Sequence, residues 1–180
     1  MEKVLKKINK EEKPRLLLHS CCGPCSSAIL ERISDYFDLD IFYYNPNIDS
    51  ENEFYRRSDE QIKLVEDLEL DDKIDVKVIK YKHEEFLSYI NGFEKYEEGG
   101  ARCFRCYRQR LEKTARYAQE NNYDYFTTTL SISQHKASQI LNRLGKFLAE
   151  KYKVNYLFSD FKKKNGFKRS VELTDKFNMY

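Results

Sequence analysis

Short apolar runs alternate along this chain with longer segments in which apolar residues recur every three or four positions. Residues 15–19, R-L-L-L-H, form the first run, and residues 20–24 bring turn-forming Ser, Gly and Pro. Ile29, Ile33 and Phe37 then follow at four-residue spacing, which is typical of the buried face of a helix. The chain therefore begins with a predicted strand, a loop and a helix.

The same alternation continues to the C-terminus. Ser50 and Glu53 form an S-x-x-E capping box, which predicts a helix from about residue 51 to residue 68. The inner face of this helix is expected to carry Phe54, Ser58, Ile62, Val65 and Leu68. Further strands are predicted at residues 39–44, 75–79, 125–129 and 154–158, and further helices near residues 84–90, 103–121 and 136–152 and at the C-terminus.

Alternating strands and helices predict βαβ units, and hence an α/β fold with a mostly parallel sheet and helices on both faces. We expect one domain over residues 1–180, with a small insertion at about 81–102 and a basic C-terminal loop and helix at 161–180. Ligands of such sheets bind at the carboxyl ends of the strands. The loops after Leu18, Tyr44, Thr129 and Phe158 are therefore expected to form the site.

Composition narrows the class of protein. The 180 residues are 41% hydrophobic and 34% charged, as in a globular domain, and no apolar run approaches the roughly 20 residues of a membrane span. The first residues lack the apolar centre of a secretory signal, so we expect a cytoplasmic protein without membrane contact. A net charge of +2 does not mark a general nucleic-acid binder, and such a role would need a local patch.

Five cysteines are the most informative feature of the sequence. Cys21, Cys22 and Cys25 form C-C-G-P-C after the first strand, and Cys103 and Cys106 form C-x-x-C at the start of a helix. Residues three apart on a helix share one face, and a helix N-terminus favours the thiolate. Cytosolic thiols stay reduced, so clustered cysteines there more often bind metal or carry out redox chemistry than form structural disulfides.

Three kinds of cysteine site fit this spacing. A structural zinc ion needs four of the five thiolates, an iron–sulfur cluster also needs four, and a dithiol pair needs two. The cysteines are expected at the carboxyl edge of the predicted sheet, where ligands bind. This position favours a metal in the active site over a purely structural metal, and an iron–sulfur cluster over zinc. Spacing alone does not choose among the three.

Two other side chains are candidates for proton transfer. Asp160 follows the last predicted strand, on the side where the cysteines are expected to gather. His19 lies next to the first cysteine group and is a candidate ligand or proton shuttle. The ordinary alternatives are an ion-paired or helix-capping aspartate and a packed, hydrogen-bonded histidine.

A basic segment near the C-terminus is the candidate RNA-binding surface. Its cations are interleaved with Phe161 and Phe167, whose rings are candidates for stacking on unpaired bases. Arg110 and the other arginines around the C-x-x-C would extend the surface. The alternative is an ordinary solvated loop. The basic residues concerned are Lys162, Lys163, Lys164, Lys168 and Arg169.

Five long motifs together resemble one known family. These are L-L-L-H-S-C-C-G-P-C-S, F-Y-Y-N-P-N-I, G-G-A-R-C-F-R-C-Y-R-Q-R-L, Y-D-Y-F-T-T-T-L-S-I-S and S-D-F-K-K-K-N-G-F-K-R-S. In order and spacing, over residues 15–180, the chain is similar to the QueH-type epoxyqueuosine reductases. The resemblance implies a Rossmann-like (HUP-type) fold and a cobalamin-independent oxidoreductase. It also implies reduction of epoxyqueuosine to queuosine at the tRNA wobble position, the last step of queuosine biosynthesis.

The resemblance also implies cofactors and partners. Cys21, Cys22, Cys103 and Cys106 are expected to hold a [4Fe–4S] cluster, with Cys25 as an alternative ligand or part of a second metal site. The anticodon region of tRNA is the expected partner, together with an unidentified electron donor, and the protein is expected to be a monomer. Similar proteins continue beyond the equivalent of residue 180 into a C-G-C tail that relays electrons. Either this chain is truncated, which is expected to slow turnover while the fold and cluster stay intact, or this family member works without the relay.

The expected mechanism places the epoxide oxygen at an accessible iron, with two electrons delivered singly and protons from Asp160, His19 or a tyrosine. The alternative from another class is a non-catalytic RNA-binding module stapled by zinc, with the basic segment gripping RNA.

Overall fold

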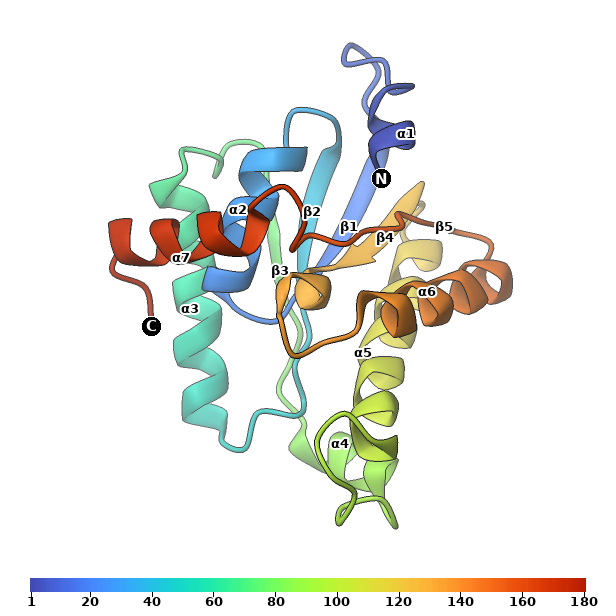
Figure 1. The fold of residues 1–180 in the computed structure, drawn as a ribbon. Coiled ribbons are helices and arrows are strands. Elements are labelled where there is room, and N and C mark those ends of the chain that lie inside the picture. The colour runs from blue at the N-terminus through green and yellow to red at the C-terminus, as the bar shows by residue number, and fades with distance from the viewer.

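A computed structural model describes residues 1–180 as a five-stranded sheet in which every neighbouring pair of strands is parallel (Figure 1). The strand order β3-β2-β1-β4-β5 places β1 at the centre. The chain adds strands on one side of β1 up to β3 and then returns to add β4 and β5 on the other side, so the order of strands reverses between β1 and β4. The expected α/β, Rossmann-like fold is thus confirmed, and the reversal marks the crevice where such sheets bind ligands. The strands are β1 Arg15–Ser20, β2 Asp38–Tyr43, β3 Val76–Val78, β4 Tyr125–Thr128 and β5 Asn155–Tyr156.

Helices cover both faces of the sheet. Figure 1 shows α2, α3 and α7 on one side, and α5 and α6 on the other. The central strand explains this: Leu16 and Leu18 enter the core on the first side, whereas Leu17 enters the core on the second. The helices are α1 Glu2–Leu5, α2 Gly23–Ile33, α3 Glu51–Asp67, α4 His83–Ile90, α5 Ala101–Glu120, α6 Ser138–Tyr152 and α7 Gly166–Lys176, with a 3₁₀ turn η1 Thr129–Ile132.

The strand register places the expected functional loops side by side. His19 of β1 pairs with Phe42 of β2 and with Thr128 of β4. The chain therefore leaves all three central strands at about the same height, into the loops that begin at Cys21, Tyr44 and Thr129. The fold alone brings distant parts of the sequence to one edge.

Two side chains differ from the predicted helix faces for an identifiable reason. On α3, Ile62 is 38% exposed and Gln61 is fully buried in its place. The Gln61 side-chain oxygen accepts hydrogen bonds from the Ser20 and Ser26 hydroxyls, at 2.6 and 2.8 Å. These partners make burial of an amide tolerable, while Phe54, Ser58 and Val65 are buried on the inner face as expected.

Another expectation about a helix is corrected at the end of α2. This helix ends at Ile33, so Phe37 lies outside it, although its ring is buried and packs edge-on against Tyr125 at 5.8 Å between centroids. Phe37 follows the four-residue spacing because it returns to the same core from the turn before β2, not because the helix continues.

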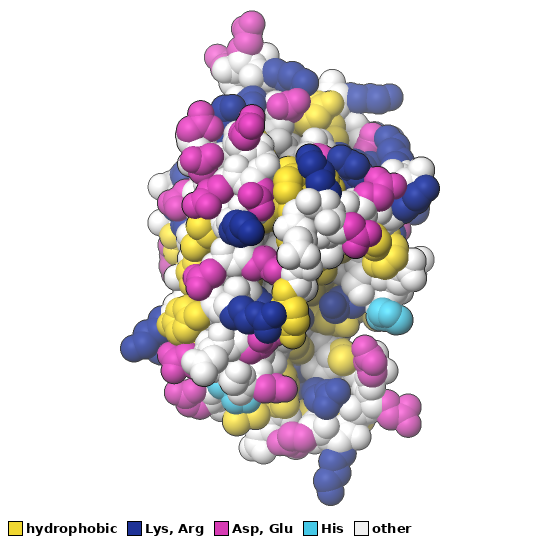
Figure 2. Space-filling model, turned by 90° about the vertical axis from the view of Figure 1, so that its left-hand side faces the viewer, with side chains coloured by type: hydrophobic (Ala, Val, Ile, Leu, Met, Phe, Trp, Pro, Cys, Tyr) yellow, Lys and Arg dark blue, Asp and Glu magenta, His cyan; other side chains and the backbone are white.

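The outer surface carries charges of both signs. On the side formed by α3 and α7, Figure 2 shows Lys and Arg side chains intermingled with Asp and Glu. None of the helices combines the length and the apolar character that crossing a bilayer requires.

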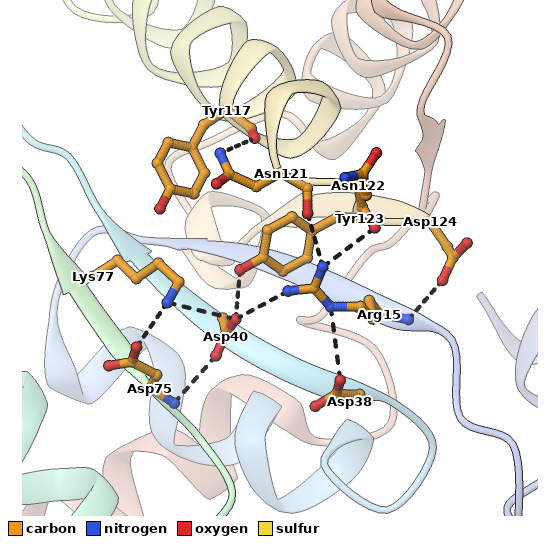
Figure 3. Close-up of polar contacts among 10 residues, drawn as sticks. All are labelled: Arg15, Asp38, Asp40, Asp75, Lys77, Tyr117, Asn121, Asn122, Tyr123 and Asp124. Carbon is orange, nitrogen blue, oxygen red and sulfur yellow. Dashed lines mark hydrogen bonds and ion pairs between the residues drawn. The ribbon is translucent and has the colours of Figure 1, made fainter.

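The amino ends of the strands are tied together by a polar network around Arg15 (Figure 3). The Arg15 guanidinium donates to the backbone carbonyl of Asn121 at 2.7 Å and lies 4.2 Å above the ring of Tyr123. The Arg15 backbone N–H donates to the Asp124 carboxylate at 2.8 Å, and the Tyr123 hydroxyl donates to Asp40. This network links β1, β2 and the loop before β4 at the edge opposite the cysteines.

Close packing of α6 on β5 makes Gly145 a sensitive position. A Cβ atom at residue 145 would lie 2.5 Å from ring atoms of Tyr156. We expect Gly145→Ala to lower the free energy of unfolding by about 1–3 kcal/mol, because overpacking forces the ring or the helix to move. Thermal unfolding followed by circular dichroism measures the loss, with Lys146→Ala, an exposed neighbour, as the control. Equal melting temperatures for Gly145→Ala and wild type would show that α6 is not packed in this way.

Candidate metal centre

The first cysteine group is built by the turn from β1 into α2. Cys21 follows the last residue of β1, and Cys22 is the N-cap of α2, with an extended backbone. Pro24 lies in the first turn of α2, where its missing N–H leaves no unpaired donor. The turn therefore presents three thiols at the N-terminus of a helix and at the carboxyl edge of the sheet.

The three sulfur atoms lie close together. The Sγ atoms of Cys21, Cys22 and Cys25 are all within 4.8 Å of one another, and Cys21 and Cys22 are 3.8 Å apart. All five cysteines of the chain are free and half-buried. Bonds of about 2.3 Å to a tetrahedral metal place two sulfurs about 3.8 Å apart, so the group fits a metal site that takes soft ligands.

The group has one thiol that ionises more readily than the other two. Hydrogen bonds from the thiols of Cys22 and Cys25 hold the pKa of Cys21 well below its usual value, assisted by the positive charge of Lys136 and the Thr129 hydroxyl. Hydrogen bonding to Cys21 conversely raises the pKa of Cys22 and of Cys25. One thiolate with two thiol donors is a set that a metal ion binds by displacing the remaining protons.

Thr129 and Lys136 are functional candidates that the sequence analysis did not single out. The Thr129 hydroxyl accepts a hydrogen bond from the Cys21 backbone N–H at 3.1 Å and lies 3.3 Å from the Cys21 sulfur. Thr129 opens η1, directly after β4. No local sequence pattern marks either residue: Thr129 meets Cys21 because β4 pairs with β1 in a register that starts both following loops at the same height.

His19 lies beneath the cysteine turn and is fully buried. Its Nε2 is 3.2 Å from the Tyr44 carbonyl oxygen, which can only accept, so Nε2 carries the hydrogen. Its Nδ1 then accepts from the Thr128 hydroxyl at 2.9 Å. Burial, with a smaller contribution from the charge of Arg110, lowers the pKa of His19 to about 3. These contacts suit a neutral side chain that fixes three strand ends, and proton donation by His19 stays a prediction.

The second cysteine pair occupies the first turns of α5. Gly99 adopts a φ of 82°, which favours glycine, and its N–H donates to the Cys103 sulfur at 3.3 Å. Cys103 packs against the same hydrophobic core as Cys21. Cys103 and Cys106 are nevertheless not among the sulfurs that lie within 4.8 Å of one another. The structure groups three of the five cysteines and leaves this pair separate.

Arg110 connects the two cysteine groups through the core. This side chain is only 4% exposed, which corrects the expectation that it extends a basic surface. Its guanidinium donates to the backbone carbonyl of Cys106 and to the side-chain oxygen of Asn45, both at 3.4 Å. The Asn45 amide donates in turn to the Ser20 carbonyl at 2.9 Å. The start of α5 is therefore tied to the end of β1, at the carboxyl edge.

Asp160 lies after β5 and is paired with lysines. Its carboxylate is 3.7 Å from the Lys162 amine and 4.0 Å from that of Lys163. The Lys162 amine also donates to the backbone carbonyl of Lys136 at 2.9 Å. Asp160 is not among the ligand atoms that gather with the three sulfurs. Its catalytic role stays a prediction.

The basic C-terminal segment is largely neutralised within the molecule. Lys164 pairs with Glu2 at 2.6 Å, and Arg169 pairs with Glu31 at 2.8 Å. Lys168 is exposed and makes no ion pair. Phe161 is 1% exposed, so the expectation that its ring stacks on a base is wrong: the ring fills the core beside α2 and α7. The mixture of charges in Figure 2 agrees with this pairing, and RNA binding by the segment stays a prediction.

Comparison with known proteins gives one consistent result. A family model described as "Epoxyqueuosine reductase QueH" matches residues 16–180. A protein of that name from Staphylococcus epidermidis is 39% identical over 188 residues, covering 99% of this chain and 79% of the relative. Relatives with the same name from Streptococcus pyogenes serotype M1 and Thermotoga maritima are 37% and 31% identical. The matches cover 100% and 92% of this chain, and 72% and 84% of those relatives.

Proposed function

The chain belongs to the QueH family of epoxyqueuosine reductases and is an oxidoreductase of queuosine biosynthesis. From this premise we propose that it converts epoxyqueuosine to queuosine at the wobble position of tRNA. The observation that carries the proposal is the group of three sulfurs, all within 4.8 Å of one another, at the carboxyl edge of the sheet. Family membership removes the support for a non-catalytic RNA-binding module.

The chemistry of this reaction favours iron over zinc. Reduction of an epoxide to an alkene breaks two carbon–oxygen bonds, takes up two electrons and two protons, and releases the oxygen as water. Zinc has no redox chemistry, whereas thiolate-bound iron–sulfur clusters transfer single electrons. The donor set, composed of sulfur and lying beside the crevice, fits such a cluster. When bound, the cluster supplies electrons and a Lewis-acidic iron.

We assign the ligands of a [4Fe–4S] cluster to Cys21, Cys22, Cys103 and Cys106. Cys25 lies close enough to Cys21 and Cys22 to replace one ligand or to share a second metal ion with them. The link from Cys106 through Arg110 and Asn45 to the end of β1 supports this assignment, because it ties the start of α5 to the strand that leads into the first cysteine group.

The chain's own residues would then hold the ligands and manage protons. Thr129 holds the Cys21 backbone and sulfur in place, and Lys136 adds positive charge beside that thiolate. His19 keeps the ends of the strands in register. Asp160 is the proposed proton donor to the departing oxygen, because it follows β5 and its side chain is 24% exposed.

Partners and place of action follow from the substrate. We propose that the anticodon region of tRNA is the substrate and that a separate, still unidentified protein or small molecule donates the electrons. We also propose that the protein is a monomer and acts in the cytoplasm, where tRNA is found. Residues 81–102 form the proposed insertion, which includes α4 and packs against the start of α5: the Arg105 side chain donates to the Tyr89 carbonyl at 2.6 Å. Of the basic residues in the C-terminal segment, Lys168 is the one most available to a phosphate, because it is exposed and makes no ion pair.

Metal removal tests the proposal. Protein prepared without oxygen, with a chemical reductant, should convert epoxyqueuosine in tRNA to a nucleoside that lacks one oxygen atom, as seen by mass spectrometry of the digested tRNA. Chelation of iron should abolish this conversion, and iron with sulfide should restore it, because thiolate ligands alone supply neither the electron path nor the Lewis acid. Full conversion by the metal-free protein, or restoration by zinc, would refute the proposed role of iron.

A further inference from the structure

A groove between α5 and α6 is the most distinctive surface outside the cysteine turn. Its volume is about 370 Å³, comparable to the size of a small-ligand pocket. The two helices lie side by side on one face of the sheet (Figure 1). The groove is lined by Phe104, Arg108, Ile140, Arg143, Leu144 and Phe147.

The groove exposes apolar side chains that a globular protein ordinarily buries. Phe104 is 44% exposed, Phe147 is 52% exposed and Ile140 is 37% exposed. Phe104 and Arg108 are one helical turn apart on α5, as are Arg143 and Phe147 on α6. Each helix thus presents one aromatic ring and one guanidinium to the same hollow, and an exposed patch of this kind marks an interaction site.

The charge of the groove is positive. Two arginines line it and no acidic residue does. Arg143 makes no ion pair, and Arg108 shares Glu112, at 3.6 Å, with the Lys151 amine. The basic segment after β5, in contrast, has most of its cations paired with carboxylates. The groove therefore offers the free guanidinium that the basic segment lacks.

The position of the groove relates it to the metal centre. Phe104 stands between Cys103 and Cys106, in the first turn of α5. The start of α6 follows the loop that carries Lys136, whose charge acts on Cys21. The groove thus begins at the second cysteine pair, on the side of the molecule where the substrate nucleoside is expected to enter.

We propose that this groove binds an unpaired nucleotide of the RNA next to the one that reacts. A base stacks on the rings of Phe104 and Phe147, and the adjoining phosphates pair with Arg108 and Arg143. Stacking on aromatic side chains with basic residues alongside is how proteins hold single-stranded loops of RNA. This inference rests on the proposed function, because it requires an RNA substrate.

Binding of an RNA stem-loop with an unpaired anticodon loop tests the inference. Fluorescence anisotropy gives the dissociation constant for wild type, Phe147→Ala and Arg143→Glu. We expect Phe147→Ala to bind roughly 5- to 150-fold more weakly, the range set by the stacking of one base, and Arg143→Glu to bind more weakly because it loses a phosphate contact and adds a repelling charge. Arg143→Glu should also weaken the dependence of affinity on salt, whereas Phe147→Ala should not. Tyr55→Ala, an exposed ring on α3, and Lys7→Glu, an exposed cation after α1, are the matched controls and should bind like wild type.

The outcomes separate this inference from the function it rests on. If wild type does not bind the stem-loop, the proposed function fails. If wild type binds and both groove variants bind within about twofold of it, the groove inference alone fails. It also fails if the variants keep RNA affinity but lose turnover only with a protein electron donor, because the groove would then receive that donor. Circular dichroism and metal content equal to wild type show that a variant is folded.

Discussion

The Cys22→Ala variant is expected to lose epoxide reduction down to the uncatalysed background. Cys22 caps α2 with an extended backbone, and its sulfur is 3.8 Å from that of Cys21. Removing it takes one ligand from the proposed cluster and breaks up the group of three sulfurs. The fold should survive, because the Cys22 carbonyl still accepts from Ser26 in the first turn of α2. The measurement is conversion of epoxyqueuosine in tRNA, with far-ultraviolet circular dichroism and iron content on the same sample.

Ser27→Ala is the matched control for this variant. Ser27 is a buried residue of the same helix, and its hydroxyl donates only to the Pro24 carbonyl, at 2.9 Å. It should retain activity and iron. A Cys22→Ala protein that is folded, contains iron and turns over like wild type would show that the first cysteine group is not part of the active site.

The Arg110→Ala variant is expected to be the most destabilising single change around the site. Truncation leaves the Asn45 side-chain oxygen and the Cys106 carbonyl without this buried donor. The Cys106 carbonyl keeps its bond from the Arg110 backbone N–H within α5, so only the Asn45 oxygen is orphaned, and the free energy of unfolding should fall by about 1–3 kcal/mol. Below its melting temperature the variant should also bind less iron, because the start of α5 is no longer tied to the end of β1.

Arg116→Ala is the control for this loss, since Arg116 lies on the same helix but is exposed. Thermal unfolding of the metal-free proteins isolates the effect on the fold, and iron content after reconstitution isolates the effect on the site. Unchanged stability and iron content in Arg110→Ala would show that the two cysteine groups are held together by other contacts.

The apolar pattern was sufficient to predict the sheet, because short apolar or alternating runs recur between helical segments, and the central strand of a doubly covered sheet is almost continuously apolar. The central strand β1 shows this most clearly, with Leu16, Leu17 and Leu18 fully buried. The same logic placed C-C-G-P-C at the carboxyl edge, since a parallel sheet leaves little choice of where the loop after β1 lies.

The contacts that decide which polar side chains are buried were not predictable from the chain alone. Arg110 looked like surface charge, because its partner Asn45 is 65 positions away and meets it only in the fold. Gln61 replaced Ile62 on the inner face of α3 for the same reason, through Ser20 and Ser26. Thr129 and Lys136 act on Cys21 across the sheet, and no local pattern marks such neighbours.

The C-terminal segment shows a second limit. The alternation of lysines with Phe161 and Phe167 resembled an RNA-stacking loop, but Phe161 belongs to the core that α7 covers. Lys164 and Arg169 find their carboxylates on α1 and α2, far away in sequence. The basic and aromatic composition of the segment therefore did not predict an exposed binding surface. The surface that does have exposed aromatic rings and a free guanidinium lies on α5 and α6.

Iron and sulfide analysis of protein purified without oxygen tests the central claim most directly. We predict a brown protein with iron and acid-labile sulfide in equal amounts, about four of each per chain, as a [4Fe–4S] cluster requires. A colourless protein with one zinc ion per chain and no iron would contradict it.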